Sequence, residues 1–259
     1  MSFAAIMNGL QAFLLLQVLT CLGQIGHGSE IIHGQKAPEN SFLYMVSLQN
    51  NRGHVCGGFL IREDFVMTAA HCYRFSPLHV VLGTHNLKDL HNEKIEVEKR
   101  FITPFFNYTD LRDDIMLLKL ANKTQLNSRV QTIQLPPGEI NLEDNEICQV
   151  AGWGKTSSNG PSVDELRMVD VSVINPRECK EMWDHKKFVL PANVICAGGY
   201  PRNKGFCQGD SGGPLVCKRK AVGVVSFNRN SICKYPDVPN IYTDISKHLK
   251  WINLVLKHN

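Results

Sequence analysis

The sequence is organised around the stretch Gly209-Asp210-Ser211-Gly212-Gly213-Pro214, in which one serine stands among glycines directly after an aspartate. Glycine adopts backbone conformations that other side chains forbid, and it lets amide N–H groups approach a bound molecule closely. A serine hydroxyl beside bare amides suits a nucleophile next to an oxyanion hole. An ordinary glycine-rich turn has the same composition, so the assignment depends on whether the chain also supplies a base, an orienting acid and a scaffold.

Two other motifs supply those groups. Thr68-Ala69-Ala70-His71-Cys72 places a histidine directly after an apolar strand, where a satisfied core histidine is the alternative. Asp113-Asp114-Ile115-Met116-Leu117-Leu118 places acids at the start of a strongly apolar strand, where a buried carboxylate needs a partner. With the serine they occur in the order His, Asp, Ser, which is the chymotrypsin order and differs from the subtilisin and α/β-hydrolase orders. The three motifs together predict nucleophilic catalysis.

The first thirty residues differ in composition from the rest of the chain. They contain no Lys or Arg, their apolar run from Leu10 to Leu22 is short for a membrane span, and small residues follow at Gly26 and Gly28. This pattern predicts a secretory signal peptide over residues 1–28, with a membrane anchor as the alternative. Because no second apolar segment of this kind follows, we expect the mature chain not to associate with a membrane.

The overall composition is that of an ordinary globular protein. The chain has 259 residues, 43% of them hydrophobic and 20% charged, which is enough for one large domain or two modest ones. Removal of residues 1–30 raises the formal net charge from +4 to +5. That charge permits attraction to a sulfated proteoglycan, but it is far from the clustered charge of a nucleic-acid binder, so we expect no nucleic-acid partner. The densest basic run, Lys218-Arg219-Lys220, is typical of a solvated hairpin tip.

Cysteines and two sequons indicate an exported protein. Of the nine cysteines only Cys21 lies in the leader, and an even number behind a secretion signal predicts four disulfides. Zinc is the alternative, but no Cys-x-x-Cys pair or Cys/His cluster has ligand spacing, so we expect no metal. The mature cysteines allow on the order of 100 pairings, among which spacing does not choose. The sequons at Asn107 and Asn122 predict glycans on surface loops.

Short strands and turns dominate the chain after residue 31. Brief apolar or β-branched runs, bounded by polar or glycine-rich pieces, predict strands at 43–48, 57–61, 65–68, 79–82, 95–101, 115–120, 147–152, 166–174, 194–198, 214–217, 221–227 and 241–244. Only Ile245, Leu249, Ile252 and Leu256 recur at helical spacing. The sequence therefore predicts an all-β protein with one C-terminal amphipathic helix, and a polar linker over about residues 121–130 between two β halves.

Seven motifs in one order make the chain resemble the trypsin/chymotrypsin-type serine proteases from Ile31 to the C-terminus. Besides the three motifs above, they are Ile31-Ile32-His33-Gly34, Cys56-Gly57-Gly58, Ala151-Gly152-Trp153-Gly154 and Val225-Ser226-Phe227. The resemblance implies a serine protease domain over residues 31–259, built from two six-stranded antiparallel β-barrels with the active site between them. It makes Ser211 the nucleophile and His71 the base and later the acid.

The resemblance also implies the roles of the other site residues. Asp114 orients His71, and it is preferred to Asp113 because it directly precedes the apolar strand. The amide N–H groups of Gly209 and Ser211 form the oxyanion hole, and Ser226 hydrogen-bonds to the catalytic aspartate. No cofactor is implied. The implied disulfides are Cys56–Cys72, Cys148–Cys217, Cys179–Cys196 and Cys207–Cys233, the last of which many granzyme B and chymase relatives lack.

In this family a new N-terminus, here Ile31, pairs with the acid before the nucleophile, here Asp210, so the resemblance implies an inactive precursor. The residue before Ile31 is Glu30 rather than Lys or Arg, which disfavours trypsin-like activation. The activation dipeptide 29–30 resembles that of granzymes and of mast-cell or neutrophil granule proteases, which a dipeptidyl peptidase removes. We therefore expect storage in leukocyte secretory granules and serpin-type inhibitors as partners, with constitutive secretion as a digestive or plasma protease as the alternative.

The resemblance places the substrate-binding pocket at Gly205, Phe206, Gln208, Ser226, Asn228 and Asn240. No carboxylate stands at its floor, and burying a guanidinium without an acid is costly, so cleavage after Lys or Arg is disfavoured. The two asparagines and Phe206 should narrow the pocket. We predict cleavage of protein or peptide substrates after a small or medium apolar residue.

The competing hypothesis is a protease-like protein that binds without catalysis. Such homologues usually lose His, Asp or Ser, whereas all three stand here with the oxyanion glycine. The calcium loop of some relatives is not evident, because residues 85–92 lack a clear set of acidic ligands. The sequence therefore favours an active, metal-free serine endopeptidase.

Overall fold

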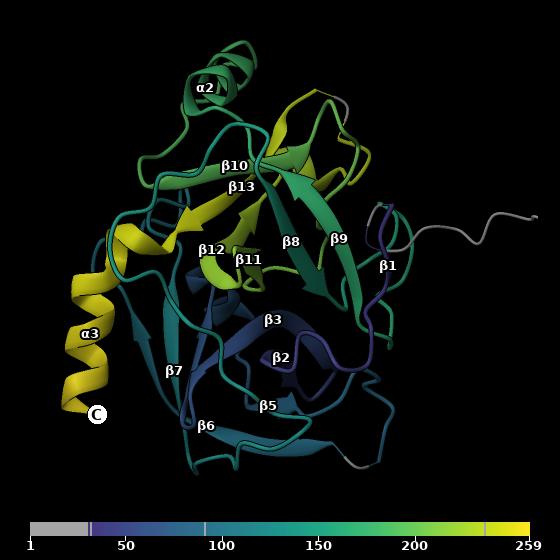
Figure 1. Ribbon diagram of the computed structural model, residues 1–259, viewed down its shortest axis with the longest axis vertical. Helices are drawn as coiled ribbons and strands as arrows, with labels where there is room; N and C mark the ends of the chain where they lie inside the picture. The colour runs from purple at the N-terminus through teal and green to yellow at the C-terminus, as the bar shows by residue number, and fades with distance from the viewer. Residues whose placement is uncertain (1–30, 32, 91, 236) are drawn as a thin grey trace, which may run out of the picture.

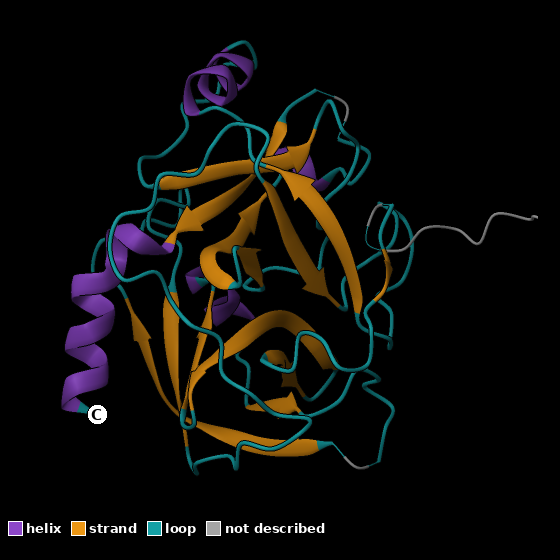
Figure 2. Ribbon diagram, viewed as in Figure 1, coloured by secondary structure: helices purple, strands orange, loops and turns teal. Residues whose placement is uncertain are grey.

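The computed structural model describes residues 31, 33–90, 92–235 and 237–259 (Figure 1). The predicted signal peptide at 1–28 and activation dipeptide at 29–30 lie outside the described residues. Within the described ranges strands dominate, and the two α-helices lie at the periphery (Figure 2). None of the described helices has the length and apolar character needed to cross a membrane.

Six antiparallel strands of the first half close into a barrel. Their order is β2-β3-β4-β7-β6-β5, and β5 pairs with β2. Register shifts at Leu60/Arg62 in β3 and Val97/Lys99 in β6 bend these two long strands, which helps the sheet to close. Side chains that point inward, such as that of Phe59, are fully buried. The strands are β2 (Met45–Asn50), β3 (Gly53–Arg62), β4 (Phe65–Thr68), β5 (His79–Leu82), β6 (Glu93–Ile102) and β7 (Met116–Leu120).

The second half forms a sheet of order β1-β9-β8-β11-β12-β13-β10. A bridge between Val173, just beyond β9, and Ala197 in β10 joins the two ends of its six longer strands, and the Ile174 N–H donates to Cys196 O at 2.9 Å there. These strands therefore close into a second barrel, with β1 added beside β9. The strands are β1 (Gln35–Lys36), β8 (Ile147–Gly152), β9 (Arg167–Ser172), β10 (Val194–Gly199), β11 (Pro214–Cys217), β12 (Lys220–Phe227) and β13 (Pro239–Asp244).

The prediction of an all-β protein with two six-stranded antiparallel barrels and a C-terminal helix is confirmed. Four strands, 65–68, 79–82, 147–152 and 214–217, have the predicted bounds, and the other predicted strands begin and end within four residues of theirs. The additional strand β1 has only two residues, both exposed, so no apolar run marks it.

The prediction of a single helix was wrong, because α2 (Pro176–Asp184) lies between β9 and β10. Asn175 caps it, its side chain accepting from the Arg177 N–H at 2.9 Å, and Pro176 stands in the first turn. Only Cys179 and Trp183 are buried along its length. A helix of nine residues with two buried side chains is too short to show a helical period, which is why periodicity did not reveal it.

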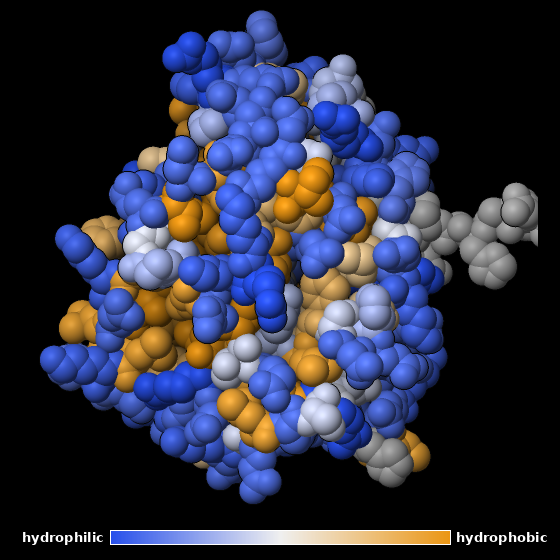
Figure 3. Space-filling view, viewed as in Figure 1, coloured by the Kyte–Doolittle hydropathy of each residue, from blue (hydrophilic) through white to orange (hydrophobic). Residues whose placement is uncertain are grey.

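The predicted C-terminal helix is α3 (Leu249–His258), which follows the 3-10 helix Ile245–His248. Ile245, Ile252 and Val255 join the core of the first barrel together with Val216 and Val224 from the second. Figure 3 shows apolar side chains gathered beside this helix, and smaller apolar patches elsewhere on the same face. The C-terminal helix therefore packs where the two barrels meet.

The connection between the barrels runs from β7 to β8 through residues 121–146. Its first part is the polar stretch expected as the linker, and most of its residues are exposed although Thr124 is buried. Val130 and Ile133 follow and are buried, and the Ile133 N–H donates to Leu60 O at 3.0 Å. The connection is therefore held against the first barrel rather than bridging free space.

Candidate active site

Two residues of the predicted catalytic set come from the first barrel. His71 lies in the 3-10 helix Ala70–Phe75 that follows β4, and Asp114 lies just before β7. The Nδ1 atom of His71 is 2.7 Å from Asp114 Oδ2, and the His71 backbone N–H donates to Asp114 Oδ1 at 2.8 Å. Because an ionised carboxylate only accepts, Nδ1 of His71 carries the proton and Nε2 is left to accept one.

The second barrel completes the surroundings of Asp114, which is fully buried. Ser226 of β12 donates its hydroxyl to Asp114 Oδ2 at 2.6 Å. Thr243 of β13 donates to the backbone carbonyl of Asp114 at 3.0 Å. Buried polar groups need hydrogen-bond partners, and this carboxylate has them on both oxygens. The acid is thus carried by one barrel and held by the other.

The adjacent Asp113 faces different partners. It accepts from Asn193 Nδ2 at 3.0 Å, and its Oδ1 lies 3.4 Å from His248 Nε2. Its φ of 53° is in the left-handed region and breaks the extended course of the chain between the two acids. Of the two acids in the motif, Asp114 is therefore the one that contacts His71.

Ser211 comes from the second barrel, in the turn before β11, and lines one cleft with His71 and Ser226. Its backbone carbonyl accepts from the Gly57 N–H at 2.8 Å, which ties its turn to β3 of the first barrel. The cleft is bounded by residues of both barrels, including Val55, Thr109, Leu111, Phe188 and Phe227. The structure therefore brings together the three residues that the motifs predicted.

The turn before Ser211 presents two bare amides. Gly209 has a φ of 100°, a conformation that favours glycine. The carbonyl of Gln208 accepts from the Lys155 N–H at 2.7 Å, so the Gly209 N–H, on the other side of the same trans peptide, faces away from Lys155. Among the described residues neither this N–H nor that of Ser211 has an acceptor. Free N–H groups beside the nucleophile are what an oxyanion hole requires.

His54 of β3, which no sequence motif marked, supports this turn from the other side. Its Nε2 is 2.9 Å from Gly209 O and its Nδ1 is 2.8 Å from Ser47 Oγ. Since a carbonyl only accepts, Nε2 donates to Gly209 and Nδ1 accepts the serine proton. Burial lowers the pKa of His54 to about 4, so the ring is neutral near pH 7 and can keep this tautomer. The contact joins residues 155 positions apart, beyond the reach of any local pattern.

Asp210 is fully buried, with an amide donor on each carboxylate oxygen. The Gly154 N–H donates to Oδ1 and the Cys207 N–H donates to Oδ2, both at 2.8 Å. Burial raises the pKa of Asp210 to about 7 despite these hydrogen bonds, and no cation in the described part of the chain offsets it. The side chain of Ile31 is fully buried in the core of the second barrel, in the same cluster as Phe206.

The carboxyl group of Asp210 packs directly on the backbone of the Ala151-Gly152-Trp153-Gly154 motif. A Cβ atom at Gly154 would stand 2.6 Å from Asp210 Cγ, and one at Gly152 would stand 2.1 Å from its Oδ1. No larger residue fits either position without displacing Asp210. This close approach explains physically why the motif contains glycine on both sides of the tryptophan.

The predicted substrate-binding residues divide into two groups. Phe206, Gln208, Ser226 and Asn228 line the cleft, whereas Gly205 and Asn240 are not among its lining residues in the described structure. Asn240 is fully buried, and a Cβ atom at Gly205 would stand 2.1 Å from its Nδ2. Tyr235, which the sequence did not single out, donates its hydroxyl to Phe206 O. The space expected as the floor is thus occupied by the chain's own side chains.

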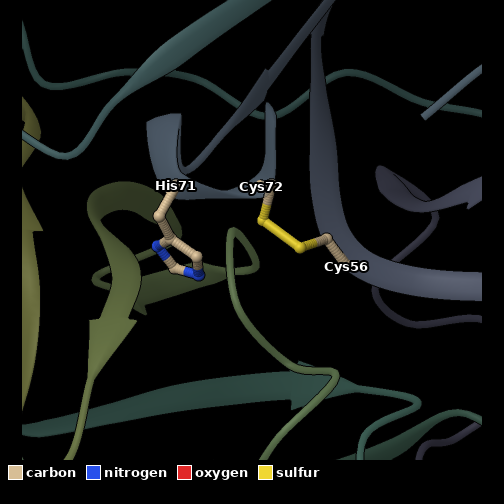
Figure 4. Close-up of side chains that lie close together, drawn as sticks. All are labelled: Cys56, His71 and Cys72. Carbon is tan, nitrogen blue, oxygen red and sulfur yellow. A yellow bond between two sulfur atoms is a disulfide. The ribbon is translucent and has the colours of Figure 1, made fainter. Parts of the chain in front are cut away.

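Four disulfides brace the site, and they are the pairs that the resemblance implied: Cys56–Cys72, Cys148–Cys217, Cys179–Cys196 and Cys207–Cys233. The first joins β3 to the short helix that carries His71, and Figure 4 shows the imidazole beside it. Cys56, His71 and Cys72 are close enough to hold a metal ion, but both sulfurs are bonded to each other and supply no thiolate. The same holds for Cys148 and Cys217 beside Glu146.

Comparison with known proteins converges on one family. The family model described as Trypsin matches residues 31–252. Duodenase-1 of Bos taurus is 39% identical over 249 residues, which cover 94% of this chain and 96% of that protein. Granzyme B of Rattus norvegicus is 38% identical over 250 residues, covering 94% and 98% of the two chains. Chymase of Canis lupus familiaris is 39% identical over 254 residues, covering 95% and 96%.

Proposed function

This chain belongs to the trypsin family of serine proteases and is a serine endopeptidase, and we propose that it cleaves peptide bonds through Ser211, His71 and Asp114. The observation that carries the proposal is the buried contact between His71 Nδ1 and Asp114, since His71 lines the cleft that also holds Ser211. A neutral histidine held in this tautomer offers Nε2 as a base toward the cleft.

In the proposed reaction Ser211 Oγ attacks the carbonyl carbon of the substrate while His71 Nε2 takes the hydroxyl proton. An ester bond to Oγ forms, the C–N bond breaks, and His71 gives the proton to the departing amine. Water then attacks the ester carbonyl while His71 again takes a proton. The ester C–O bond breaks, His71 returns the proton to Ser211 Oγ, and the acid product leaves. Asp114 holds the ring and stabilises the imidazolium that forms in each half.

The N–H groups of Gly209 and Ser211 are proposed to stabilise the oxyanion of each tetrahedral intermediate. Their lack of other acceptors in the described chain supports this role. Removing one such donor typically costs about 10²–10³ in rate, so the turn contributes on the scale of the base itself. The hydrogen bond from His54 to Gly209 O holds the peptide group between Gly209 and Asp210, which follows the Gly209 N–H donor.

We extend the proposal to activation by a new N-terminus at Ile31. Asp210 is a buried carboxylate with no cationic partner among the described residues, and burial raises its pKa. A nearby ammonium group would offset the cost of burying the charged carboxylate. Cleavage after Glu30 creates that ammonium on a residue whose side chain is already in the core of the second barrel. The two-residue acidic pro-segment favours removal by a dipeptidyl peptidase.

Cleavage is proposed to follow a small or medium apolar residue rather than Lys or Arg. Phe206, Phe227 and Leu111 give the cleft apolar walls, and Asp110 is the one acid among its described lining residues. Asp110 belongs to the loop before β7 in the first barrel, whereas Phe206 and Gln208 of the same cleft belong to the second barrel. Asn240 and Tyr235 close the floor, which disfavours long side chains.

The substrates of this endopeptidase are proteins and peptides, and its setting is proposed to be secretory. Four disulfides favour an oxidising compartment, and residues 1–28 have the composition of a signal peptide. Storage in leukocyte granules, regulation by serpin-type inhibitors and attraction to sulfated proteoglycan complete the proposal.

A fluorophosphonate label tests the triad and the activation step together. The chain is produced with a cleavable segment before Ile31, and labelling is compared before and after cleavage. We expect strong labelling only after cleavage and none in Ser211→Ala. In a separate sample, the cleaved chain without label should hydrolyse a peptide library after apolar residues. Equal labelling of Ser211→Ala contradicts the nucleophile, equal labelling before cleavage contradicts the activation step, and a preference for Lys or Arg contradicts the pocket.

A further inference from the structure

The loop between β6 and β7 carries a sequon that the proposed reaction does not use. Asn107-Tyr108-Thr109 lies in this loop, and Thr109, Asp110 and Leu111 line the cleft together with His71. The hydroxyl of Tyr108 donates to the backbone carbonyl of His71 at 3.1 Å. The sequon is therefore part of the segment that forms one rim of the cleft.

The geometry of Asn107 leaves one side-chain atom available. Its backbone N–H donates to Arg112 O at 3.1 Å, which closes the loop into a tight hairpin. Its Oδ1 accepts from the Thr109 N–H at 2.8 Å, an Asx turn that orients the side chain. Within the described chain Nδ2 of Asn107 donates to no group, and Nδ2 is the atom that would carry a sugar.

An aromatic hollow adjoins this side chain. Phe105 is 68% exposed and Tyr108 is 49% exposed, and they line a surface hollow with Phe106, Asn107 and Arg112. Phe106 and Tyr108 pack edge to face with ring centroids 5.3 Å apart. Exposed aromatic rings in one place mark a site that binds something. The C–H face of a sugar ring is a chemically matched occupant, and the sequon asparagine supplies the attachment point.

We propose that Asn107 carries an N-linked glycan that stands at the rim of the cleft, admits short peptides, and slows the entry of folded proteins. In its formation the Nδ2–C1 bond to the first N-acetylglucosamine replaces the C1–O bond to a lipid pyrophosphate donor. The lipid pyrophosphate leaves, and the amide gives up one proton. The first sugar rests against Phe105, and the outer sugars extend beyond the hairpin.

The selectivity follows from how the two kinds of substrate reach Ser211. A short peptide lies within the cleft and touches only its walls. A folded protein must bring the surface on both sides of its cleaved segment against the rim, where the glycan excludes volume. The proposal rests on the secretion and protease activity proposed above, because the sugar is added only in the secretory pathway.

The second sequon is a matched control within the same chain. Asn122 is exposed just beyond the end of β7, and the Thr124 hydroxyl of this sequon donates to Glu93 Oε2 at 2.7 Å. None of the residues Asn122 to Thr124 lines the cleft. A glycan at Asn122 adds the same mass and hydrophilic surface without standing at the rim.

The test uses the full chain secreted from mammalian cells that make only high-mannose glycans, then activated at Ile31. Asn107→Gln, Asn122→Gln and the wild type are compared, and part of the wild type is trimmed with an endoglycosidase that leaves one sugar. Mass spectrometry reports the sugar on each asparagine. Two substrates carry the same cleavable heptapeptide, one free and one in an exposed loop of a folded protein.

We expect sugar on Asn107. Both trimming and Asn107→Gln should raise kcat/KM for the folded protein by about threefold or more. The kcat/KM for the free heptapeptide should stay unchanged within about twofold. Asn122→Gln should change neither value. An Asn107 without sugar, or a glycan whose removal leaves the ratio of the two substrates unchanged, overturns the proposal. Failure to cleave even the free heptapeptide would instead overturn the protease mechanism, while the mass spectrum still reports whether Asn107 is modified.

Discussion

Replacing Gly154 by alanine is expected to damage catalysis from a position outside the catalytic set. A Cβ atom at this site would stand 2.6 Å from Asp210 Cγ and 2.7 Å from Asp210 N, closer than carbon atoms tolerate. Asp210 cannot easily yield, because it is fully buried and accepts the N–H groups of Gly154 and Cys207. Relief therefore requires movement of the turn that carries Gly209 and Ser211.

The size of the effect follows from two costs. Overpacking a buried site typically lowers the free energy of unfolding by about 1–3 kcal/mol, which for a domain of this size lowers the melting temperature by roughly 2–12 °C. A shifted turn also misplaces an oxyanion donor, whose loss costs about 10²–10³ in rate. Because the donor is displaced and not removed, we expect a smaller effect than its loss would cause. The kcat/KM of activated Gly154→Ala should fall by about tenfold to a hundredfold.

The assay compares Gly154→Ala with Gly138→Ala in peptide hydrolysis, fluorophosphonate labelling and thermal unfolding. A Cβ atom at Gly138 would meet nothing within 4 Å, so this variant controls for the substitution itself. We expect it to match the wild type in activity and in melting temperature. If Gly154→Ala keeps kcat/KM within about twofold of the Gly138→Ala value, the packing of Asp210 on this backbone does not position the oxyanion hole.

Two further predictions concern buried carboxylates. In the uncleaved chain burial raises the pKa of Asp210 from 3.8 to about 7, so its protonated form stabilises the fold below about pH 4 and that stabilisation is lost as the pH rises to 7. Urea unfolding measures the free energy of unfolding of wild type and of Asp210→Asn at both ends of this pH range. Before activation, wild type should lose about 4 kcal/mol more than Asp210→Asn between about pH 4 and pH 7, and after activation it should lose much less. An equal loss before and after activation would refute the pairing of Asp210 with Ile31. Ser226→Ala removes the 2.6 Å hydrogen bond to Asp114 Oδ2 and should lower kcat about tenfold, because leaving a buried acceptor short of a partner costs about 1–3 kcal/mol. Thr243→Val loses the hydrogen bond to the backbone carbonyl of Asp114 and should lower the melting temperature with little change in kcat. A larger fall in kcat for Thr243→Val than for Ser226→Ala would contradict the role of Ser226.

The sequence by itself determined the strands and the reacting groups. Runs such as 65–68 and 214–217 are apolar segments bounded by turn residues, so local chemistry already sets where they begin and end. The motifs around His71, Asp114 and Ser211 each combine a reactive side chain with the local backbone that it needs. The resemblance carried by their order extended this to the two barrels and the cysteine pairs.

Only the tertiary structure decided how distant groups meet. Three contacts join residues that are far apart in the chain. His54 donates to Gly209, Asn240 packs against Gly205, and Asp210 packs against Gly154. Helix α2 was likewise missed, since a cap and two buried side chains make too short a pattern. The physical reason is the same in each case: burial and close approach depend on strand register and barrel closure, which no local window of sequence contains.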